Sequence, residues 1–238
     1  MSSTLYIANK NYSSWSLRPW VLMKQLGIAF HEQVVPFGIG SNWQAFRAFS
    51  PTGKVPCLLT EAGIVWDSLG IAEYLAEEHP NVWPADSRAR TWGRCASAEM
   101  HSGFTALRSQ CPMNCSIEVL RHGTDAALQA DLDRLQELWK EGLMRFGGPF
   151  LGGDSFTAVD AFFCPVAFRV QSYGLPLNEA CQAYVHRLLH LPAMQEWKAQ
   201  AVAELWVEPS HEEACLATGN IVKDLRVKAW AIGTPEGV

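Results

Sequence analysis

Residues 50–59 read Ser-Pro-Thr-Gly-Lys-Val-Pro-Cys-Leu-Leu, which is a turn followed by a short apolar strand. Proline and glycine mark the turn, and the pair Val55-Pro56 lies where the turn passes into the strand. A proline at such a position sometimes retains a cis peptide bond, although a trans bond is commoner for an isolated Val-Pro pair. A cis bond would turn the N–H and C=O of Val55 outward, where an extended peptide could pair with them as an added strand.

Elements on both sides of this stretch extend it into a small α+β unit. The spacing of apolar residues predicts strands and helices in the order βαβαββα, and we expect this unit over residues 1–82. Gly27 stands where a left-handed residue commonly follows the end of a helix. The expected strands are 5–8, 33–35, 57–59 and 64–66, and the expected helices are 13–26, 43–49 and one that begins at Ser68.

The pattern becomes helical after a linker with a Trp-Pro pair, which we place at residues 83–89. We expect an all-helical domain over residues 90–238, with no structure assigned to residues 221–238. Thr157 and Asp160 have the spacing of a capping box, which we interpret as a folding signal. The expected helices are 88–109, 124–146, 158–172, 179–189 and 194–204.

Composition and charge exclude several classes of protein. The 19 basic and 24 acidic residues give a formal charge of −5 without a basic run, so we expect no nucleic-acid or anionic-membrane partner. The first residues lack the basic start and long apolar stretch of a signal peptide, and no apolar run is long enough for a membrane span, so we expect neither. Seven scattered cysteines, an odd number, do not form a secreted disulfide framework, and we expect a cytoplasmic location.

Two groups of hydroxyl-bearing residues stand at expected helix starts. Ser13 and Ser14 lie in the run Asn-Tyr-Ser-Ser-Trp-Ser at residues 11–16, where one serine would cap the helix and another would be free for function. Asp67 and Ser68 precede a helix whose start would favour a bound carboxylate. Ser68 taken alone is equally well explained as an ordinary N-cap.

Together these features resemble the soluble glutathione transferases over about residues 4 to 210. The stretch at 51–56, the Asp67-Ser68 pair and the box at 157–160 occur in that family's order and spacing. The resemblance implies a thioredoxin-like N-terminal domain, an all-helical C-terminal domain, glutathione as co-substrate, a role in detoxification and a homodimer. The run at residues 13–18 is most similar to the serine-type classes zeta and tau.

The resemblance also implies roles for individual residues. Ser13, five residues before Arg18, would stabilise the glutathione thiolate, with Ser14 as the alternative. Trp15 stands where zeta proteins have a cysteine, a departure from the pattern of the maleylacetoacetate isomerases. The residues that would bind glutathione are Lys54 at the glycine carboxylate, Val55 with Pro56 at the cysteine backbone, and Asp67 with Ser68 at the γ-glutamyl end.

The electrophile would lie against the helical domain, opposite the serines. Met100, Phe104 and Leu107 share one expected helical face, and Arg108 stands beside them as a candidate for binding an acidic group. An apolar stripe of this kind is more often core than pocket, and that alternative stays open. His186 and His190 are four residues apart, but no carboxylate completes a metal site, so we expect no metal.

Three functions remain compatible with these residues. The first is a transferase that directs the thiolate at a small, largely hydrophobic electrophile. The second is a glutathione-dependent isomerase or reductase of the zeta type, in which the tripeptide is returned. The third is a non-catalytic binding or regulatory protein on the same fold.

Overall fold

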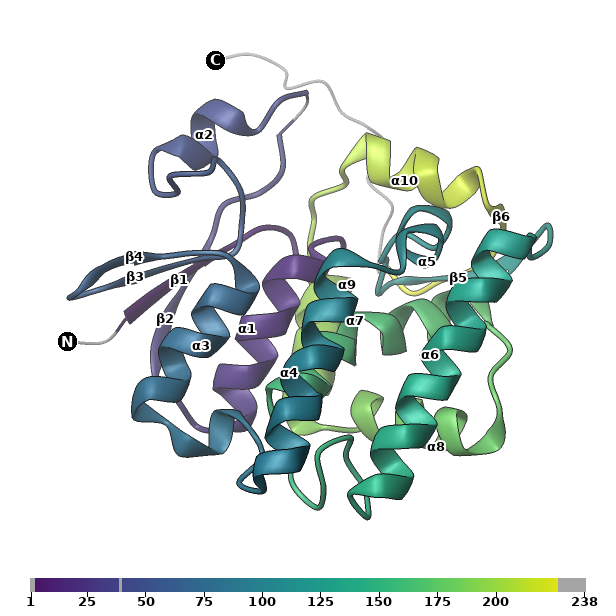
Figure 1. Ribbon diagram of the computed structural model, residues 1–238. Coiled ribbons are helices and arrows are strands. Elements are labelled where there is room, and N and C mark those ends of the chain that lie inside the picture. Colours follow the sequence, from purple (N-terminus) through teal and green to yellow (C-terminus); the bar gives the residue numbers. More distant parts are fainter. Residues whose placement is uncertain (1–2, 39, 227–238) are drawn as a thin grey trace, which may run out of the picture.

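The computed structural model describes residues 3–38 and 40–226. A four-stranded sheet with helices beside it precedes a larger group of helices, so the expected fold class is confirmed (Figure 1). The expected boundaries at residues 82 and 90 stay predictions, and the last part of the expected C-terminal domain, residues 227–238, lies outside the described residues. The first elements are β1 (Ser3–Ile7), α1 (Ser14–Gln25), β2 (Phe30–Val34), α2 (Trp43–Arg47), β3 (Cys57–Thr60), β4 (Gly63–Val65), α3 (Ser68–Glu78) and η1 (Pro80–Val82).

The sheet has the order β2-β1-β3-β4. Strand β1 runs parallel to β2 and antiparallel to β3, and β4 pairs back on β3 as the expected hairpin. Helix α1 is the crossover between the two parallel strands. It ends as expected, because Gly27 has a φ of 69° and the N–H of Ile28 donates to the carbonyl of Met23 at 2.9 Å.

Helix α7 is the centre of the second group. All its residues except Gln171 are buried, and the predicted capping box of Thr157 and Asp160 is present at its start. The elements of this group are α4 (Ser87–Ser102), α5 (Thr105–Gln110), β5 (Ile117–Arg121), α6 (Ala126–Arg145), α7 (Ala158–Tyr173), α8 (Glu179–Leu189), α9 (Pro192–Ala203), α10 (Pro209–Leu216) and β6 (Gly219–Asp224).

Two expectations for this group are wrong in detail. The single helix expected over residues 88–109 is interrupted, because Phe104 adopts a left-handed conformation with a φ of 52° between α4 and α5. The group also contains a two-stranded antiparallel sheet of β5 and β6, two strands that are far apart in the sequence, so it is not all-helical. Part of β6 falls in the segment to which no structure was assigned.

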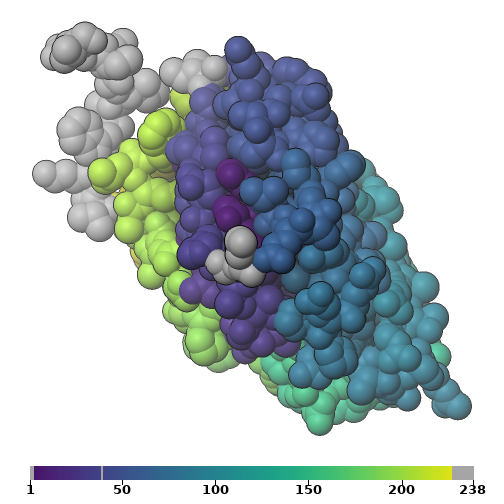
Figure 2. Space-filling view, turned by 90° about the vertical axis from the view of Figure 1, so that its left-hand side faces the viewer, coloured from purple at the N-terminus to yellow at the C-terminus, as the bar shows by residue number. Residues whose placement is uncertain are grey.

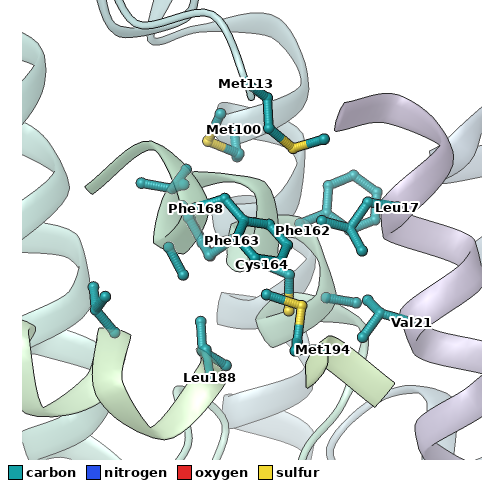
Figure 3. Close-up of a cluster of buried hydrophobic side chains, with 14 of the residues drawn as sticks. Leu17, Val21, Met100, Met113, Phe162, Phe163, Cys164, Phe168, Leu188 and Met194 are labelled. Carbon is teal, nitrogen blue, oxygen red and sulfur yellow. The ribbon is translucent and has the colours of Figure 1, made fainter. Parts of the chain in front are cut away.

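The sheet domain and the helices share one apolar core. Leu17 and Val21 of α1 face Phe162 and Cys164 of α7, and Met100 of α4 lies in the same cluster (Figure 3). The end of the helical group also lies against the start of the chain, as the lime and purple atoms of Figure 2 show. There the backbone N–H of Lys10 donates to Glu204 Oε1 at 2.6 Å, across 194 residues of sequence. Helix α1 therefore packs against α7, and the loop that precedes it is bound to the residue that follows α9.

Candidate functional site

The loop between β1 and α1 is fixed by contacts to the helical domain. The carbonyl of Lys10 accepts a hydrogen bond from the indole of Trp197 at 2.9 Å. Asn11 Oδ1 accepts from the N–H of Cys115 at 2.9 Å and from the hydroxyl of Ser116 at 2.8 Å. These side chains are buried, so the start of α1 has little freedom to move.

The serine pair lies at that helix start. Ser13 is the N-cap residue by backbone conformation, and its hydroxyl donates to Ser16 Oγ at 2.7 Å instead of capping α1. Ser14 Oγ accepts from Nη2 of Arg169 at 3.4 Å. Both serines line a cavity of about 740 Å³. Capping therefore does not occupy either hydroxyl.

The turn before β3 forms another wall of the same cavity. Lys54 and Val55 line it, and the Val55-Pro56 bond is cis, which is the rarer of the two forms that the sequence left open. The N–H and C=O of Val55 have no hydrogen-bond partner within the described residues. Gly53 allows the turn, because its φ is 61° and a Cβ there would come within 2.5 Å of the indole of Trp43.

Asp67 and Ser68 lie at the start of α3, and neither lines this cavity. Asp67, not Ser68, is the N-cap, because its carboxylate accepts from the N–H groups of Leu69 and Gly70. The interpretation of Ser68 as an N-cap is therefore wrong. The Ser68 hydroxyl is buried without a partner, while Asp67 pairs with Nε2 of His101 at 3.0 Å and stays 53% exposed.

The structure separates the four residues expected at the electrophile site. Met100, Phe104 and Leu107 are buried in the core and do not line the cavity, which corrects the expectation that they form its wall. Their side chains pack inside the helical domain, as the competing interpretation held, although Met100 lies on α4, Leu107 on α5 and Phe104 between the two helices. Arg108 does line the cavity.

Several lining residues were not expected from the sequence. Arg169 comes from α7, where it is the one basic residue in a buried apolar run, a signal that would have singled it out. His211 of α10 stacks on Phe37 with ring centroids 5.3 Å apart and lies 5.1 Å from the ring of Tyr12. The apolar part of the wall comprises Trp15, Phe37, Trp43, Phe46, Pro112 and Met113.

Positive charge gathers on one side of the cavity. Burial, with a smaller contribution from the charge of Arg108, lowers the pKa of Arg169 to about 10. Burial lowers the pKa of Arg18 well below its usual value, and the charges of Arg169 and Arg108 contribute to the same shift. Arg18 lies behind the wall, with its guanidinium carbon 4.1 Å from the ring centroid of Trp15.

The part of the chain that the structure describes contains neither a candidate metal site nor a helix that could span a membrane. Residues 3–38 and 40–226 hold no group of three His, Cys, Asp or Glu side chains that could bind a metal ion. No helix in the same ranges has the length and apolar character that crossing a membrane requires.

Comparisons with known proteins agree with the fold. Family models of the glutathione S-transferase N-terminal and C-terminal domains match residues 12–78 and 118–199. A probable maleylacetoacetate isomerase from Caenorhabditis elegans is 24% identical over 177 residues, which are 73% of this chain and 81% of that protein. A stringent starvation protein A homolog from Pasteurella multocida is 23% identical over 175 residues, 71% of this chain and 77% of that protein.

Solved structures share the fold at similar sequence distance. The crystal structure of a glutathione transferase homolog from Burkholderia, with bound glutathione, has a TM-score of 0.63 and 24% identity. The match covers 84% of this chain and 98% of that one. This likeness shows the fold of both domains.

Proposed function

This chain belongs to the glutathione S-transferase family, and from that premise we propose that it binds glutathione and directs its thiolate at a small electrophile. One observation carries the proposal. Ser13, Ser14, Lys54 and Val55 come from two separate segments and line one cavity at the start of α1. The family relative crystallised with bound glutathione supports the same ligand here.

The serine pair provides the chemistry at the sulfur. A thiol titrates ordinarily near pH ~8.5, and its thiolate is the nucleophile. A hydroxyl that donates a hydrogen bond to the sulfur anion stabilises it by roughly 1.5–3 kcal/mol. Ser13 is the proposed donor, because it lies buried at the helix start, where water competes least and the helix dipole favours an anion. Its hydroxyl turns from Ser16 to the sulfur, and Ser16 Oγ keeps the N–H of Ala8.

The rest of the tripeptide is proposed to extend from that sulfur along the turn before β3 and out of the cavity to the start of α3. The unpaired N–H and C=O of Val55, ahead of Pro56, receive the cysteine backbone as a short added strand. Lys54 faces the glycine carboxylate. Asp67 and Ser68 hold the γ-glutamyl end, which the exposed carboxylate and the unpartnered hydroxyl support.

The proposed electrophile lies against the aromatic and methionine side chains of the cavity. These apolar residues favour a small, largely hydrophobic substrate and a role in detoxification. The isomerase relative favours a second candidate, glutathione-dependent isomerisation. Product analysis distinguishes the two reactions, because conjugation leaves a sulfur-containing adduct and isomerisation returns free glutathione.

We also expect a homodimer in the cytoplasm. Leu59, Ile64 and Trp66 are exposed apolar side chains around the β3–β4 hairpin, and a second copy of the chain would cover such a surface. Sedimentation at micromolar concentration measures the mass. A monomeric mass would contradict the dimer without affecting the proposed site.

The experiment that tests the function is titration of glutathione into the wild-type protein by calorimetry. We expect binding below millimolar concentration and a thiolate absorbance signal that weakens in Ser13→Ala. No binding at millimolar glutathione would overturn the proposal, and a non-catalytic role like that of other proteins on this fold would then be favoured.

A further inference from the structure

Two arginines line the cavity without any acidic partner. The cavity wall contains Lys54, Arg108 and Arg169 but no aspartate or glutamate. Within the described residues neither Arg108 nor Arg169 takes part in an ion pair. The carboxylate of Asp67 acts by its charge on Arg18, which lies behind the wall. The cavity therefore has an uncompensated positive charge.

Both guanidinium groups keep donors to spare. Arg108 makes two long hydrogen bonds of 3.4 Å, from Nη1 to the carbonyls of His101 and Gly103, and its guanidinium carbon lies 4.7 Å from the ring centroid of Trp15. Its Nε and Nη2 donate no hydrogen bond within the described residues. Arg169 donates from Nε to the carbonyl of Cys111 at 2.8 Å, from Nη1 to Pro165 at 3.3 Å and from Nη2 to Ser14. A guanidinium has five N–H donors, so each group can still bind an oxyanion.

Backbone carbonyls and the ring of Trp15 position the two guanidinium groups but neutralise neither charge. Arg169 is 5% exposed, and an uncompensated buried charge is strongly unfavourable. The like charge of Arg108, which lowers the pKa of Arg169, adds to that cost. An anionic ligand removes both penalties, because it neutralises the pair and accepts the unused N–H groups in the fork geometry that carboxylates match.

We propose that Arg108 and Arg169 bind a carboxylate of the second substrate, which makes this enzyme selective for acidic electrophiles. The inference rests on the proposed function, since it places the electrophile next to glutathione. Arg169 contacts Ser14, the residue after the proposed thiolate donor, so the carboxylate lies close to the reacting sulfur. The apolar wall then holds the remainder of the substrate.

The test uses two unreactive glutathione derivatives that differ in one group. The first is S-butylglutathione, and the second is its analogue in which the terminal methyl group is a carboxylate. Calorimetry gives their dissociation constants and that of glutathione with wild type, Arg108→Gln and Arg169→Lys. Arg88→Gln is the control, because it removes the same charge from an exposed position on α4.

We expect wild type and Arg88→Gln to prefer the carboxylate analogue about tenfold, as one charge-assisted hydrogen bond allows. The preference falls to about twofold or less in Arg108→Gln and decreases in Arg169→Lys, which keeps the charge but not the fork. The affinity for glutathione itself stays unchanged in Arg108→Gln.

Other results overturn the inference. Equal or tighter binding of the butyl derivative by wild type would exclude an anion site, and so would a preference that survives in both arginine variants. Weaker binding of glutathione itself by Arg108→Gln would assign this arginine to a carboxylate of the tripeptide. If wild type binds neither glutathione nor a derivative, the proposed function fails and this inference fails with it.

Discussion

Ser14 Oγ lies 3.4 Å from Nη2 of Arg169, although 155 residues separate the two in sequence. The contact joins the start of α1 in the sheet domain to the central helix of the helical domain. It also places a positive charge next to the serine pair, where a thiolate and an acidic substrate would meet. We therefore expect the two serines to have different roles, with Ser13 donating to the thiolate and Ser14 contacting Arg169.

Substituting each serine separately tests this division. In Ser13→Ala we expect the pKa of the bound glutathione thiol to rise by about one to two units, because a hydrogen bond of roughly 1.5–3 kcal/mol is lost. In Ser14→Ala we expect that pKa to stay near the wild-type value. Thiolate absorbance measured against pH gives both values. The reverse result would identify Ser14 as the donor.

Lys54 gives a prediction about affinity. Lys54→Ala is expected to weaken glutathione binding about tenfold, because the glycine carboxylate loses a charge-assisted hydrogen bond. The loss should be smaller at high salt, since Lys54 is exposed and its interactions are screened. Calorimetry at two salt concentrations measures this, with the exposed Lys140→Ala on α6 as control. Equal losses in the two variants would mean that Lys54 has no specific role.

The local signals in the sequence predicted the parts of the fold that local chemistry determines. The turn at residues 50–59, the glycine after α1 and the capping box of α7 each depend on neighbouring residues, and the structure confirms all three. Strand β5 was not predicted, because Leu120 is as apolar as the buried Ile117 and Val119 but is exposed, so apolar and polar residues do not alternate along it. Its partner β6 begins about a hundred residues later, so the pairing was not predictable from either segment.

The site shows a similar limit. The spacing of Met100, Phe104 and Leu107 predicted that these apolar side chains would be covered. It did not show whether other parts of the protein or a ligand would cover them. Packing inside the helical domain covers them. The apolar run around Arg169 could have singled this residue out, but only the packing of α7 against α1 brings it to Ser14.

Gly53 gives a prediction about the turn at residues 50–59. Gly53→Ala is expected to cost roughly 1–2 kcal/mol of unfolding free energy, because the φ of 61° is unfavourable for alanine. Its Cβ would also displace the indole of Trp43, which lines the cavity, so glutathione binding should weaken. Urea unfolding and calorimetry measure the two effects.

The control for this prediction is Gly123→Ala. Its φ is not in the left-handed region, and a Cβ there meets nothing within 4 Å. We expect this variant to keep the affinity of wild type for glutathione. If Gly53→Ala also keeps that affinity, the turn does not need glycine to shape the cavity.

Asp160 connects the stability of the fold to pH. Its buried carboxylate accepts hydrogen bonds from the N–H of Leu151 at 3.0 Å, the N–H of Thr157 at 2.9 Å and the hydroxyl of Tyr184 at 2.8 Å. Burial nevertheless raises its pKa from 3.8 to about 6. A group whose pKa is raised by folding stabilises the protein fully below the unfolded-state value, and that contribution is lost as pH rises through about 6.

The lost contribution amounts to about 3 kcal/mol. Asparagine does not titrate, so the difference in unfolding free energy between wild type and Asp160→Asn isolates the effect. We expect this difference to be largest near pH ~4 and to shrink as pH rises toward ~7. Urea unfolding across that range measures it, with Asp154→Asn as an exposed control. A difference that does not change with pH would show that Asp160 titrates alike in the folded and unfolded chain.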